Sequence, residues 1–255
     1  MPTRLRVLLA PAEIAALRRE DLGETTCVVF DILRATTTML TALANGAEAI
    51  VPVEEIAEAL DWKARHPDVL LGGERQGLRI GASLTGGVEF DLGNSPAEYM
   101  RDVVEGRTIV MTTTNGTRAL RACLGASAIY LGSFLNLRAV TQRLQEDPPE
   151  SLLLVCSGTG DQPALEDILA AGALCEKVWS HYSMDLDSDG PEVARRLHAL
   201  MGATLGEAML SACNGRRLLA QPHLRDDVPR CVQRETLSIL AGMDPEGVVR
   251  RIPAP

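Results

Sequence analysis

The chain has 255 residues and a mass of 27.4 kDa, and 46% of its residues are apolar and 23% charged. It is therefore long enough to bury a large core and too apolar for a disordered protein. Only 3% of the residues are aromatic, so aliphatic side chains must build the core, and the net charge of −9 without a basic stripe excludes a typical nucleic-acid-binding protein.

Apolar runs alternate with helical patterns along the chain, which is typical of βαβ units and predicts an α/β fold with a largely parallel sheet. The expected strands are residues 4–10, 26–31, 49–53, 69–72, 108–112, 128–131 and 152–156. The expected helices are residues 12–19, 35–47, 56–65, 96–104, 117–124, 135–145 and 165–180. Residues 191–221 and the chain from residue 227 onward are expected to be helical with a short end piece.

Two segments interrupt this alternation. Residues 72–96 are rich in glycine and show little periodicity, and a loop of that length inside a compact domain is usually functional. Asp147-Pro148-Pro149 is a rigid break. We therefore expect a single domain over residues 1–255, with two packed halves that divide near 147–150 as the alternative.

Three segments share one form, in which an apolar strand leads into a short polar loop and then into a helix. They are residues 28–38, 109–120 and 152–167. In an open α/β sheet, ligands bind beyond the carboxyl ends of the strands, so we expect the three loops at one crevice. The polar residues that this places together are Asp31, Arg34, Thr112, Thr113, Thr114, Asn115, Ser157, Thr159 and Asp161.

Loops of this kind favour anions, because they present backbone N–H groups at the positive end of a helix dipole. The alternative for any single loop is that its Ser and Thr residues only cap the helix. Three converging loops together with Arg34 favour anion binding. Arg118 adds to this, since a cation in the first turn of a helix is unfavourable unless an anion lies close by.

Carboxylates accompany these loops and suit a hard cation such as Mg²⁺, which needs only one or two carboxylates beside water and phosphate. The candidates are Asp31, Glu74, Asp161, Glu166 and Asp167. Asp31 is the best of them, because it ends a buried strand, where a charge is costly unless it is paired or bound to a metal. The alternative for each is a helix cap or an arginine partner.

Several familiar motifs are missing. The six cysteines form no C-x-x-C pair and lie mostly in apolar runs, as reduced buried thiols do. A Cys-x5-Arg phosphate loop starting at Cys156 fails at Gln162, and Leu33 stands where an aspartyl-phosphate phosphatase has its second Asp. Nucleotide-binding glycine motifs and a nucleophile elbow are absent from the sequence. A secretory signal and a membrane span are not visible either, so we expect a cytoplasmic protein.

Five segments carry long and unusual motifs. Four of them are residues 29–38, 73–75, 90–96 and 112–120, which read VFDILRATTT, GER, FDLGNSP and TTTNGTRAL. The fifth combines residues 156–159, 165–167 and 171–173. In family order, these segments resemble the 2-phosphosulfolactate phosphatase (ComB) family. The resemblance implies a three-layer α/β/α fold and Mg²⁺-dependent hydrolysis of (2R)-O-phospho-3-sulfolactate to (2R)-3-sulfolactate and phosphate, a step of coenzyme M biosynthesis in methanogens.

The resemblance also suggests roles for the charged residues. We expect Asp31 with Glu74 or Asp161 to hold Mg²⁺, and Glu166 or Asp167 is the alternative to Asp161. Arg34 and the backbone N–H groups of residues 113–115 and 157–159 are expected to stabilise the transferring phosphoryl group.

The remainder of the substrate has its own candidates. Arg75 or Arg118 is expected to hold the sulfonate or the carboxylate. Further candidates for substrate binding are Thr36, Thr37, Asn94, Ser95, Thr113, Thr114, Asn115, Ser157, Gly158 and Thr159. Cys156 is the candidate for a covalent intermediate, with packing in the core as the alternative.

Two other functions fit the same residues. One is a non-catalytic protein that binds a sulfonate or phosphate metabolite, and the other is an aspartyl-phosphate phosphotransferase with Asp31 as nucleophile. In every case the expected partner is a small anionic phosphorylated compound rather than nucleic acid or a membrane. The apolar residues within 193–209 either close the core or form the seam of a homodimer.

Overall fold

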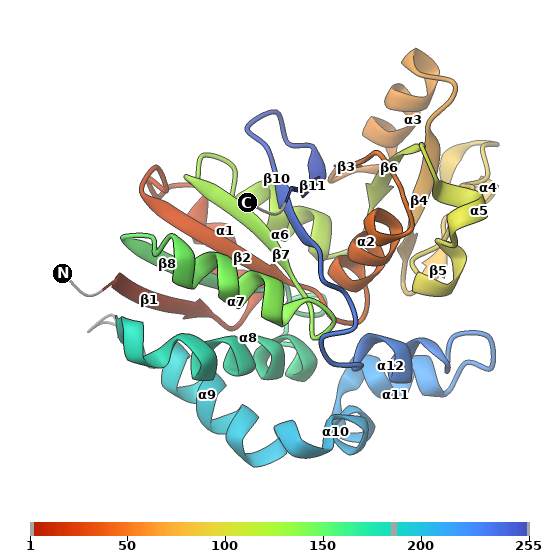
Figure 1. Ribbon diagram of the computed structural model, residues 1–255. Helices are drawn as coiled ribbons and strands as arrows, with labels where there is room; N and C mark the ends of the chain where they lie inside the picture. The colour runs from red at the N-terminus through yellow and green to blue at the C-terminus, as the bar shows by residue number, and fades with distance from the viewer. Residues whose placement is uncertain (1–2, 185–187, 254–255) are drawn as a thin grey trace.

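The computed structural model describes residues 3–184 and 188–253, and its strands form one mixed sheet (Figure 1). The strands are β1 (Thr3–Leu8), β2 (Thr25–Phe30), β3 (Ala49–Pro52), β4 (Leu70–Arg75), β5 (Leu78–Arg79), β6 (Thr108–Thr112), β7 (Ala128–Gly132), β8 (Ser151–Cys156), β9 (Tyr182–Met184), β10 (Leu240–Met243) and β11 (Val249–Ile252). Their order across the sheet is β5-β4-β6-β3-β11-β10-β7-β2-β8-β1-β9.

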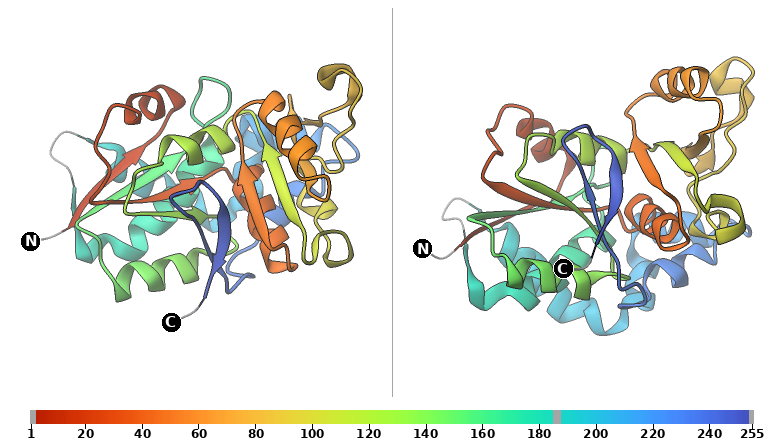
Figure 2. Two further views of the ribbon diagram at one scale, coloured as in Figure 1. Left: turned by 90° about the horizontal axis from the view of Figure 1, so that it is seen from above. Right: turned by 45° about the horizontal axis from the view of Figure 1, so that its top comes forward.

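The sheet contains two groups of parallel strands, and β5 pairs antiparallel with β4 at its edge. The larger group contains β7, β2, β8, β1 and β9, and the smaller contains β3, β6 and β4. The hairpin of β10 and β11 lies between them and pairs antiparallel with β7 on one side and β3 on the other. The smaller group stands at an angle to the larger one (Figure 2). This bend brings the carboxyl ends of strands from both groups to one cavity.

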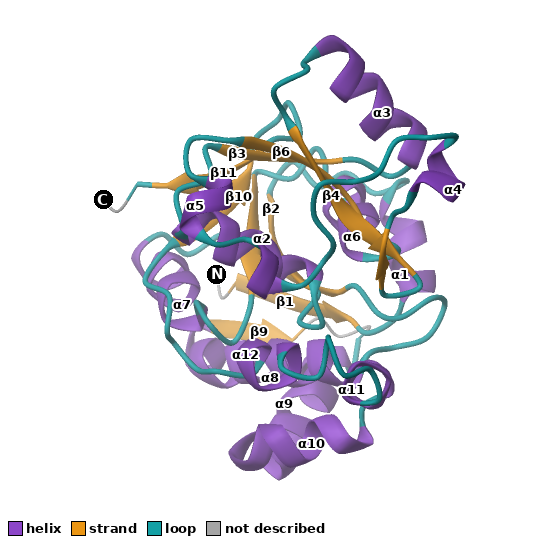
Figure 3. Cartoon of the chain, turned by 90° about the vertical axis from the view of Figure 1, so that its right-hand side faces the viewer, coloured by secondary structure: helices purple, strands orange, loops and turns teal. Residues whose placement is uncertain are grey.

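Helices cover both faces of the larger group, which gives a three-layer α/β/α arrangement (Figure 3). The helices are α1 (Pro11–Leu17), α2 (Ala35–Ala44), α3 (Ile56–Arg65), α4 (Ala82–Thr85), α5 (Arg101–Val104), α6 (Gly116–Ala122), α7 (Leu137–Glu146), α8 (Leu165–Val178), α9 (Gly190–Met201), α10 (Leu205–Ser211), α11 (Cys213–Leu219) and α12 (Asp227–Cys231). The predicted α/β fold is confirmed.

Strand β2 shows how its sequence builds these layers. Val28 and Phe30 enter the core beneath α7 to α12, whereas Cys27 and Val29 enter the core beneath α1, α2 and α6. Side chains alternate between the two faces along a strand, so an unbroken apolar run buries both faces of the sheet. The strand is therefore covered on both sides, and its polar end projects from the carboxyl edge.

The smaller group has a separate core beneath α3. Val51, Leu71 and Val110 of its strands pack with Ile80 and Phe90 of the glycine-rich segment. That segment, expected to be a functional loop, is thus held against the smaller group by two buried apolar side chains.

All seven expected strands are present, and α3 has the bounds expected for it. The expected helix over residues 96–104 is wrong. A 3-10 turn, Pro96–Glu98, ends at Tyr99, and α5 begins only at Arg101. The side chain of Tyr99 is buried and its hydroxyl donates a hydrogen bond to the Gly93 carbonyl at 2.7 Å, which fixes the chain at the break.

The C-terminal region also differs from expectation. The run over 191–221 is divided into α9, α10 and α11. A 3-10 turn, Gly202–Thr204, separates the first two, and Ala212 takes an extended conformation (ψ 140°) between the last two. Within residues 227–253, which the structure describes, only Asp227–Cys231 is α-helical, and the chain continues into β10 and β11. Tertiary pairing with β7 and β3 accounts for these two strands.

The rigid break at Asp147-Pro148-Pro149 lies in the connection between α7 and β8. Strands β7 and β8, which precede and follow it, both pair with β2. The single domain, with two halves as its alternative, stays a prediction. Among residues 3–184 and 188–253, helices are too short or too polar to cross a membrane.

Candidate active site

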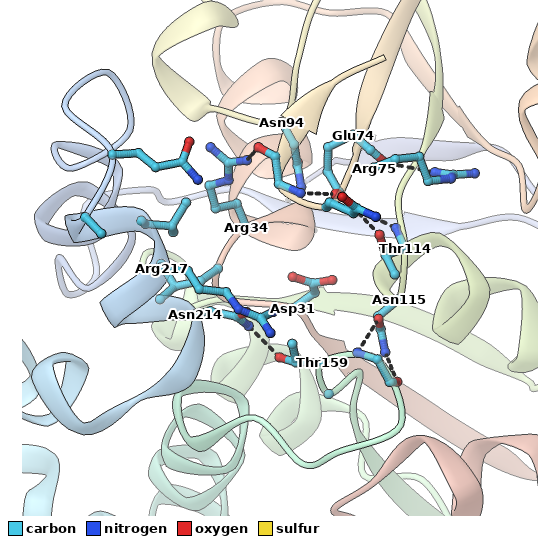
Figure 4. A pocket seen from close by; sticks show the side chains of 18 residues that line it. Asp31, Arg34, Glu74, Arg75, Asn94, Thr114, Asn115, Thr159, Asn214 and Arg217 are labelled. Carbon is cyan, nitrogen blue, oxygen red and sulfur yellow. Dashed lines mark hydrogen bonds between the residues drawn. The ribbon is translucent and has the colours of Figure 1, made fainter. Parts of the chain in front are cut away.

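A cavity of about 760 Å³ opens beyond the carboxyl ends of β2, β4, β6 and β8. The loops after these strands form one wall, and helix α11 forms the opposite wall (Figure 4). The predicted site residues that line the cavity are Asp31, Arg34, Glu74, Arg75, Asn94, Thr114, Asn115, Gly158 and Thr159. Those that do not line it are Thr36, Thr37, Ser95, Thr113, Arg118, Cys156, Ser157, Asp161, Glu166 and Asp167.

Asp31 lies at the end of β2 and is 8% exposed. Its pKa is raised to about 7, mainly by burial and also by the charges of Glu74 and Glu166, while the backbone N–H of Ala35 and the charge of Arg34 oppose the rise. Its Oδ1 accepts the Ala35 N–H at 3.0 Å. A Cβ on Gly116 would come within 2.5 Å of Oδ2, so glycine leaves room for this carboxylate.

Asp167 lies behind Asp31, in the first turn of α8, and ties two loops together. Its Oδ1 accepts the Ile32 N–H at 2.8 Å, and its Oδ2 accepts the Gly158 N–H at 3.0 Å. Burial, followed by the charges of Asp31 and Glu166, raises its pKa well above the usual range. Both oxygens are thus engaged, and Asp167 positions the loops rather than facing the cavity.

Glu166 precedes it and is 1% exposed. Its Oε1 accepts a hydrogen bond from Asn214 Nδ2 at 2.7 Å, whereas its buried Oε2 has no hydrogen-bond partner among the described residues. Burial raises the pKa of this carboxyl as well. A buried carboxylate oxygen without a donor is unfavourable, so Glu166 has capacity for a further partner.

Glu74 joins the loops after β4 and β6. Its Oε1 accepts from the backbone N–H and the hydroxyl of Thr114 at 2.8 and 2.9 Å, and its Oε2 accepts the Gly77 N–H at 2.7 Å. Asn115 joins the loops after β6 and β8 in the same way, through hydrogen bonds with Ser157 and Gly160. Both side chains therefore hold the cavity wall in place.

Arg34 forms a buried ion pair with Asp227 of α12, with 2.6 Å between Nη1 and Oδ2 and both side chains 3% exposed. Its Nη2 donates to the Gly77 carbonyl at 2.8 Å, and the other oxygen of Asp227 accepts the Ser95 hydroxyl at 2.6 Å. The guanidinium lines the cavity with its charge already neutralised.

Arg75 is also committed to protein acceptors. Its Nη2 donates to Thr112 Oγ1 at 2.9 Å and to the Glu54 carbonyl at 3.3 Å, and its Nη1 donates to the Glu74 carbonyl at 2.8 Å. Burial lowers its pKa from the ordinary value. Arg118 is exposed, pairs with Glu55 at 2.8 Å and lies outside the cavity lining.

The expectation that backbone N–H groups of two loops bind the phosphoryl group is contradicted for five of the six. Those of Thr113 and Thr114 donate to Thr117 Oγ1 and to Glu74. Those after β8 donate to the Phe30 carbonyl from Ser157, to Asp167 from Gly158 and to the Gln162 carbonyl from Thr159. These five N–H groups donate to acceptors within the protein and are not available to a ligand.

Several hydroxyl and thiol candidates are buried in the framework. Thr36 donates to the Gly132 carbonyl at 2.8 Å, Thr37 pairs with Ser133 at 2.9 Å, and Thr113 accepts the Thr117 N–H. Cys156 is fully buried, and desolvation raises the pKa of its thiol well above the usual range. The covalent role expected for Cys156 is therefore wrong for this structure, and its alternative, packing in the core, is what is observed.

The five carboxylates proposed as metal ligands do not gather into one cluster. The described part of the chain contains no group of three or more His, Cys, Asp or Glu side chains arranged to hold a metal ion. Asp161 is exposed and outside the cavity lining, and two others, Glu74 and Asp167, accept hydrogen bonds with both oxygens. Asp31 and Glu166 are left with oxygens that can take a cation.

The wall formed by α11 was not anticipated. Asn214, Arg217 and Leu218 line the cavity from this helix, followed by Ala220 and Gln221. The Asn214-Gly215 pair was the nearest signal, because such a pair inside an expected helix often marks a turn, but both residues lie within α11 and the break comes at Ala212. Asp227 was missed because its role depends on a partner 193 residues earlier in the chain.

Comparison with known proteins places these features in a family. The family model described as 2-phosphosulpholactate phosphatase matches residues 12–244. A protein of Symbiobacterium thermophilum named probable 2-phosphosulfolactate phosphatase is 39% identical over 223 residues, which is 87% of this chain and 92% of that protein. A protein of Thermotoga maritima with the same name is 40% identical over 195 residues, 76% of this chain and 79% of the relative.

Proposed function

This chain belongs to the 2-phosphosulfolactate phosphatase family, and we propose that it hydrolyses (2R)-O-phospho-3-sulfolactate to (2R)-3-sulfolactate and phosphate. The observation that carries the proposal is the extent of the family match. It runs from residue 12 to residue 244 and so includes every residue that lines the cavity, from Asp31 to Gln221. The cavity also has the size range of a small-molecule site.

Mg²⁺ is part of this proposal, and the donor chemistry fits it. Carboxylate oxygens suit Mg²⁺, which needs only one or two of them. Glu166 offers a buried oxygen without a donor, and Asp31 lies close enough for the Glu166 charge to raise its pKa. We assign the metal to Asp31 and Glu166. When bound, the ion supplies charge neutralisation to the phosphoryl group and to the departing oxygen.

The residues of the chain itself would then hold the substrate for attack by water. The loops after β4, β6 and β8 are linked by hydrogen bonds and so fix the cavity wall. Asp31 and Glu166 would therefore need no rearrangement when substrate enters. Thr159 presents its hydroxyl at the cavity, held by Asn214 Nδ2 at 2.6 Å. Arg34 is held by Asp227 and contributes shape and a buried dipole rather than a free charge.

The test is phosphate release from phosphosulfolactate, phospholactate and 2-phosphoglycerate, each with Mg²⁺ and with EDTA. Release that is selective for phosphosulfolactate and sensitive to the chelator is the expected result. Equal release from all three would support a phosphatase activity but would contradict phosphosulfolactate as its specific substrate. Binding without release in every case rejects hydrolysis and favours a metabolite-binding protein.

The cytoplasmic location and the homodimer are also predictions. All six cysteines are free thiols and five of them are buried, in keeping with a reducing compartment. Gel filtration with light scattering would decide the oligomeric state.

A further inference from the structure

Arg217 is the one arginine of the cavity lining that has no hydrogen-bond or ion-pair partner within the described residues. Arg34 is neutralised by Asp227, and Arg75 donates to three protein oxygens. The guanidinium of Arg217 makes neither a hydrogen bond nor an ion pair in residues 3–184 and 188–253. It is exposed and extends from α11 into the cavity (Figure 4).

The helix that carries Arg217 is anchored on both sides. Asn214, three residues earlier and so on the same face, donates from Nδ2 to Thr159 Oγ1 at 2.6 Å and to Glu166 Oε1 at 2.7 Å. On the opposite side a Cβ on Gly215 would come within 2.1 Å of the Met209 carbonyl oxygen, so glycine lets α11 pack directly against α10. The origin of the Arg217 side chain is thus fixed relative to the carboxylates of the sheet.

A substrate with several negative charges needs more positive charge than the sheet wall provides. Five of the six loop N–H groups expected to bind an anion donate within the protein. The sheet wall therefore presents carboxylates, an arginine neutralised by Asp227, and Arg75, whose two terminal nitrogens already donate to the protein. The remaining anionic groups must be met from the α11 wall.

We propose that Arg217 binds the sulfonate of the substrate and so determines the preference for a sulfonated phosphate ester. The inference rests on the proposed function. The sulfonate stands one carbon further from the phosphate ester than the carboxylate does, and Arg217 is an exposed residue of the α11 wall, whereas Asp31 and Glu166 are buried. A guanidinium presents two parallel N–H donors, which two sulfonate oxygens can accept together.

The test compares two substrates in four proteins. The proteins are the wild type, Arg217→Gln, Arg217→Lys and the matched control Arg216→Gln, which removes one positive charge from the neighbouring position of α11. Arg216 lies outside the cavity lining and donates to the Ser211 carbonyl. The substrates are phosphosulfolactate and phospholactate, which lacks the sulfonate, and the readout is kcat/KM for each.

Arg217→Gln is expected to lower kcat/KM for phosphosulfolactate about 10- to 100-fold, the range for a hydrogen-bonded charged group, and to lower that for phospholactate by about threefold or less. Arg217→Lys keeps the positive charge but lacks the two parallel N–H donors, so its kcat/KM for phosphosulfolactate should lie between those of the wild type and Arg217→Gln. Arg216→Gln should change both substrates by less than about twofold. Equal losses on both substrates, or no loss, would overturn the assignment of the sulfonate to Arg217.

Failure of the proposed function is visible separately, as absence of phosphate release by the wild type. In that event calorimetry with 3-sulfolactate and with lactate decides the inference. Tighter binding of 3-sulfolactate by the wild type, lost in Arg217→Gln and kept in Arg216→Gln, supports it. Binding that is the same in the wild type and Arg217→Gln overturns it.

Discussion

The two walls of the cavity are built on different principles. The sheet wall consists of loops whose polar groups bond to one another, so that Asp167 and Glu74 each accept hydrogen bonds with both oxygens. The α11 wall consists of short helices held by a few side chains, and Arg217 extends from it without a partner among the described residues. The sheet wall is thus suited to chemistry that needs fixed groups, and the α11 wall carries the arginine to which we assign the sulfonate.

Removing a charge from the sheet wall should have the largest effect on activity. Asp31→Asn is expected to lower Mg²⁺-dependent kcat/KM at least about 100-fold, because it removes one of the two proposed metal ligands. The melting temperature should stay the same or rise, since desolvation opposes the charge of Asp31 in the wild type. The control is Asp161→Asn, an exposed position outside the cavity lining, which should change kcat/KM by less than about twofold. Retention of more than about a tenth of the activity by Asp31→Asn would exclude the role given to it.

The largest effect on the free energy of unfolding should come from the buried ion pair of Arg34 and Asp227, which joins the sheet wall to helix α12. Asp227→Asn leaves the buried Arg34 charge without its partner and is expected to lower the free energy of unfolding by about 3–5 kcal/mol. Glu55→Gln, which removes an exposed partner of Arg118, should cost less than about 1 kcal/mol. Urea unfolding followed by circular dichroism measures both. Similar costs for the two variants would mean that the Arg34–Asp227 pair does not join the walls.

Removing the hydrogen bonds that hold α11 to the sheet wall should have an intermediate effect on the free energy of unfolding. Asn214→Ala removes the donor to Glu166 and to Thr159, so the free energy of unfolding should fall by about 1–3 kcal/mol, the usual cost of leaving a buried acceptor unsatisfied. We expect KM to rise more than kcat falls, because the variant loosens the α11 wall, which carries Arg217. The exposed neighbour Cys213→Ala is the control and should change neither quantity. A fall in kcat with an unchanged KM would assign Asn214 to the chemical step instead.

The smallest expected effect is on how the free energy of unfolding depends on pH, through His198 of α9. Burial lowers the pKa of His198 in α9, although Glu176 partly opposes this, and its buried Nε2 has no hydrogen-bond partner among the described residues. The unfolded chain therefore binds the proton more readily, so this contribution to stability is lost as the pH falls through the ordinary value of about 6.5. Urea midpoints at pH 7.5 and 5.5 should separate less in His198→Gln than in the wild type. An equal separation in both proteins would show that His198 does not contribute.

Local sequence was sufficient for the strands and for the gathering of their loops. The run Thr26 to Phe30 is apolar and β-branched, so it becomes a buried strand in any packed sheet, and Asp31 then lies at its carboxyl end. The three strand–loop–helix segments meet at one cavity for the same reason.

Other features depended on partners far away in the chain. The N–H groups of Ile32 and Gly158 are occupied by Asp167, and the first of these hydrogen bonds spans 135 residues. A polar, glycine-containing loop looks the same in sequence whether its donors face a ligand or a distant carboxylate. The α11 wall was hidden for a related reason, since the break at Ala212 that turns the helix depends on packing against α10.

The hairpin of β10 and β11 has a consequence for synthesis of the protein on the ribosome. Its residues, 240–252, come after those of every other strand in sequence order, yet they occupy the middle of the sheet. Until they emerge, β3 and β7 present open edges, which are templates for pairing with other chains. The nascent polypeptide therefore depends on β10 and β11 to close the middle of its sheet, and a product truncated before residue 240 is expected to be prone to aggregation.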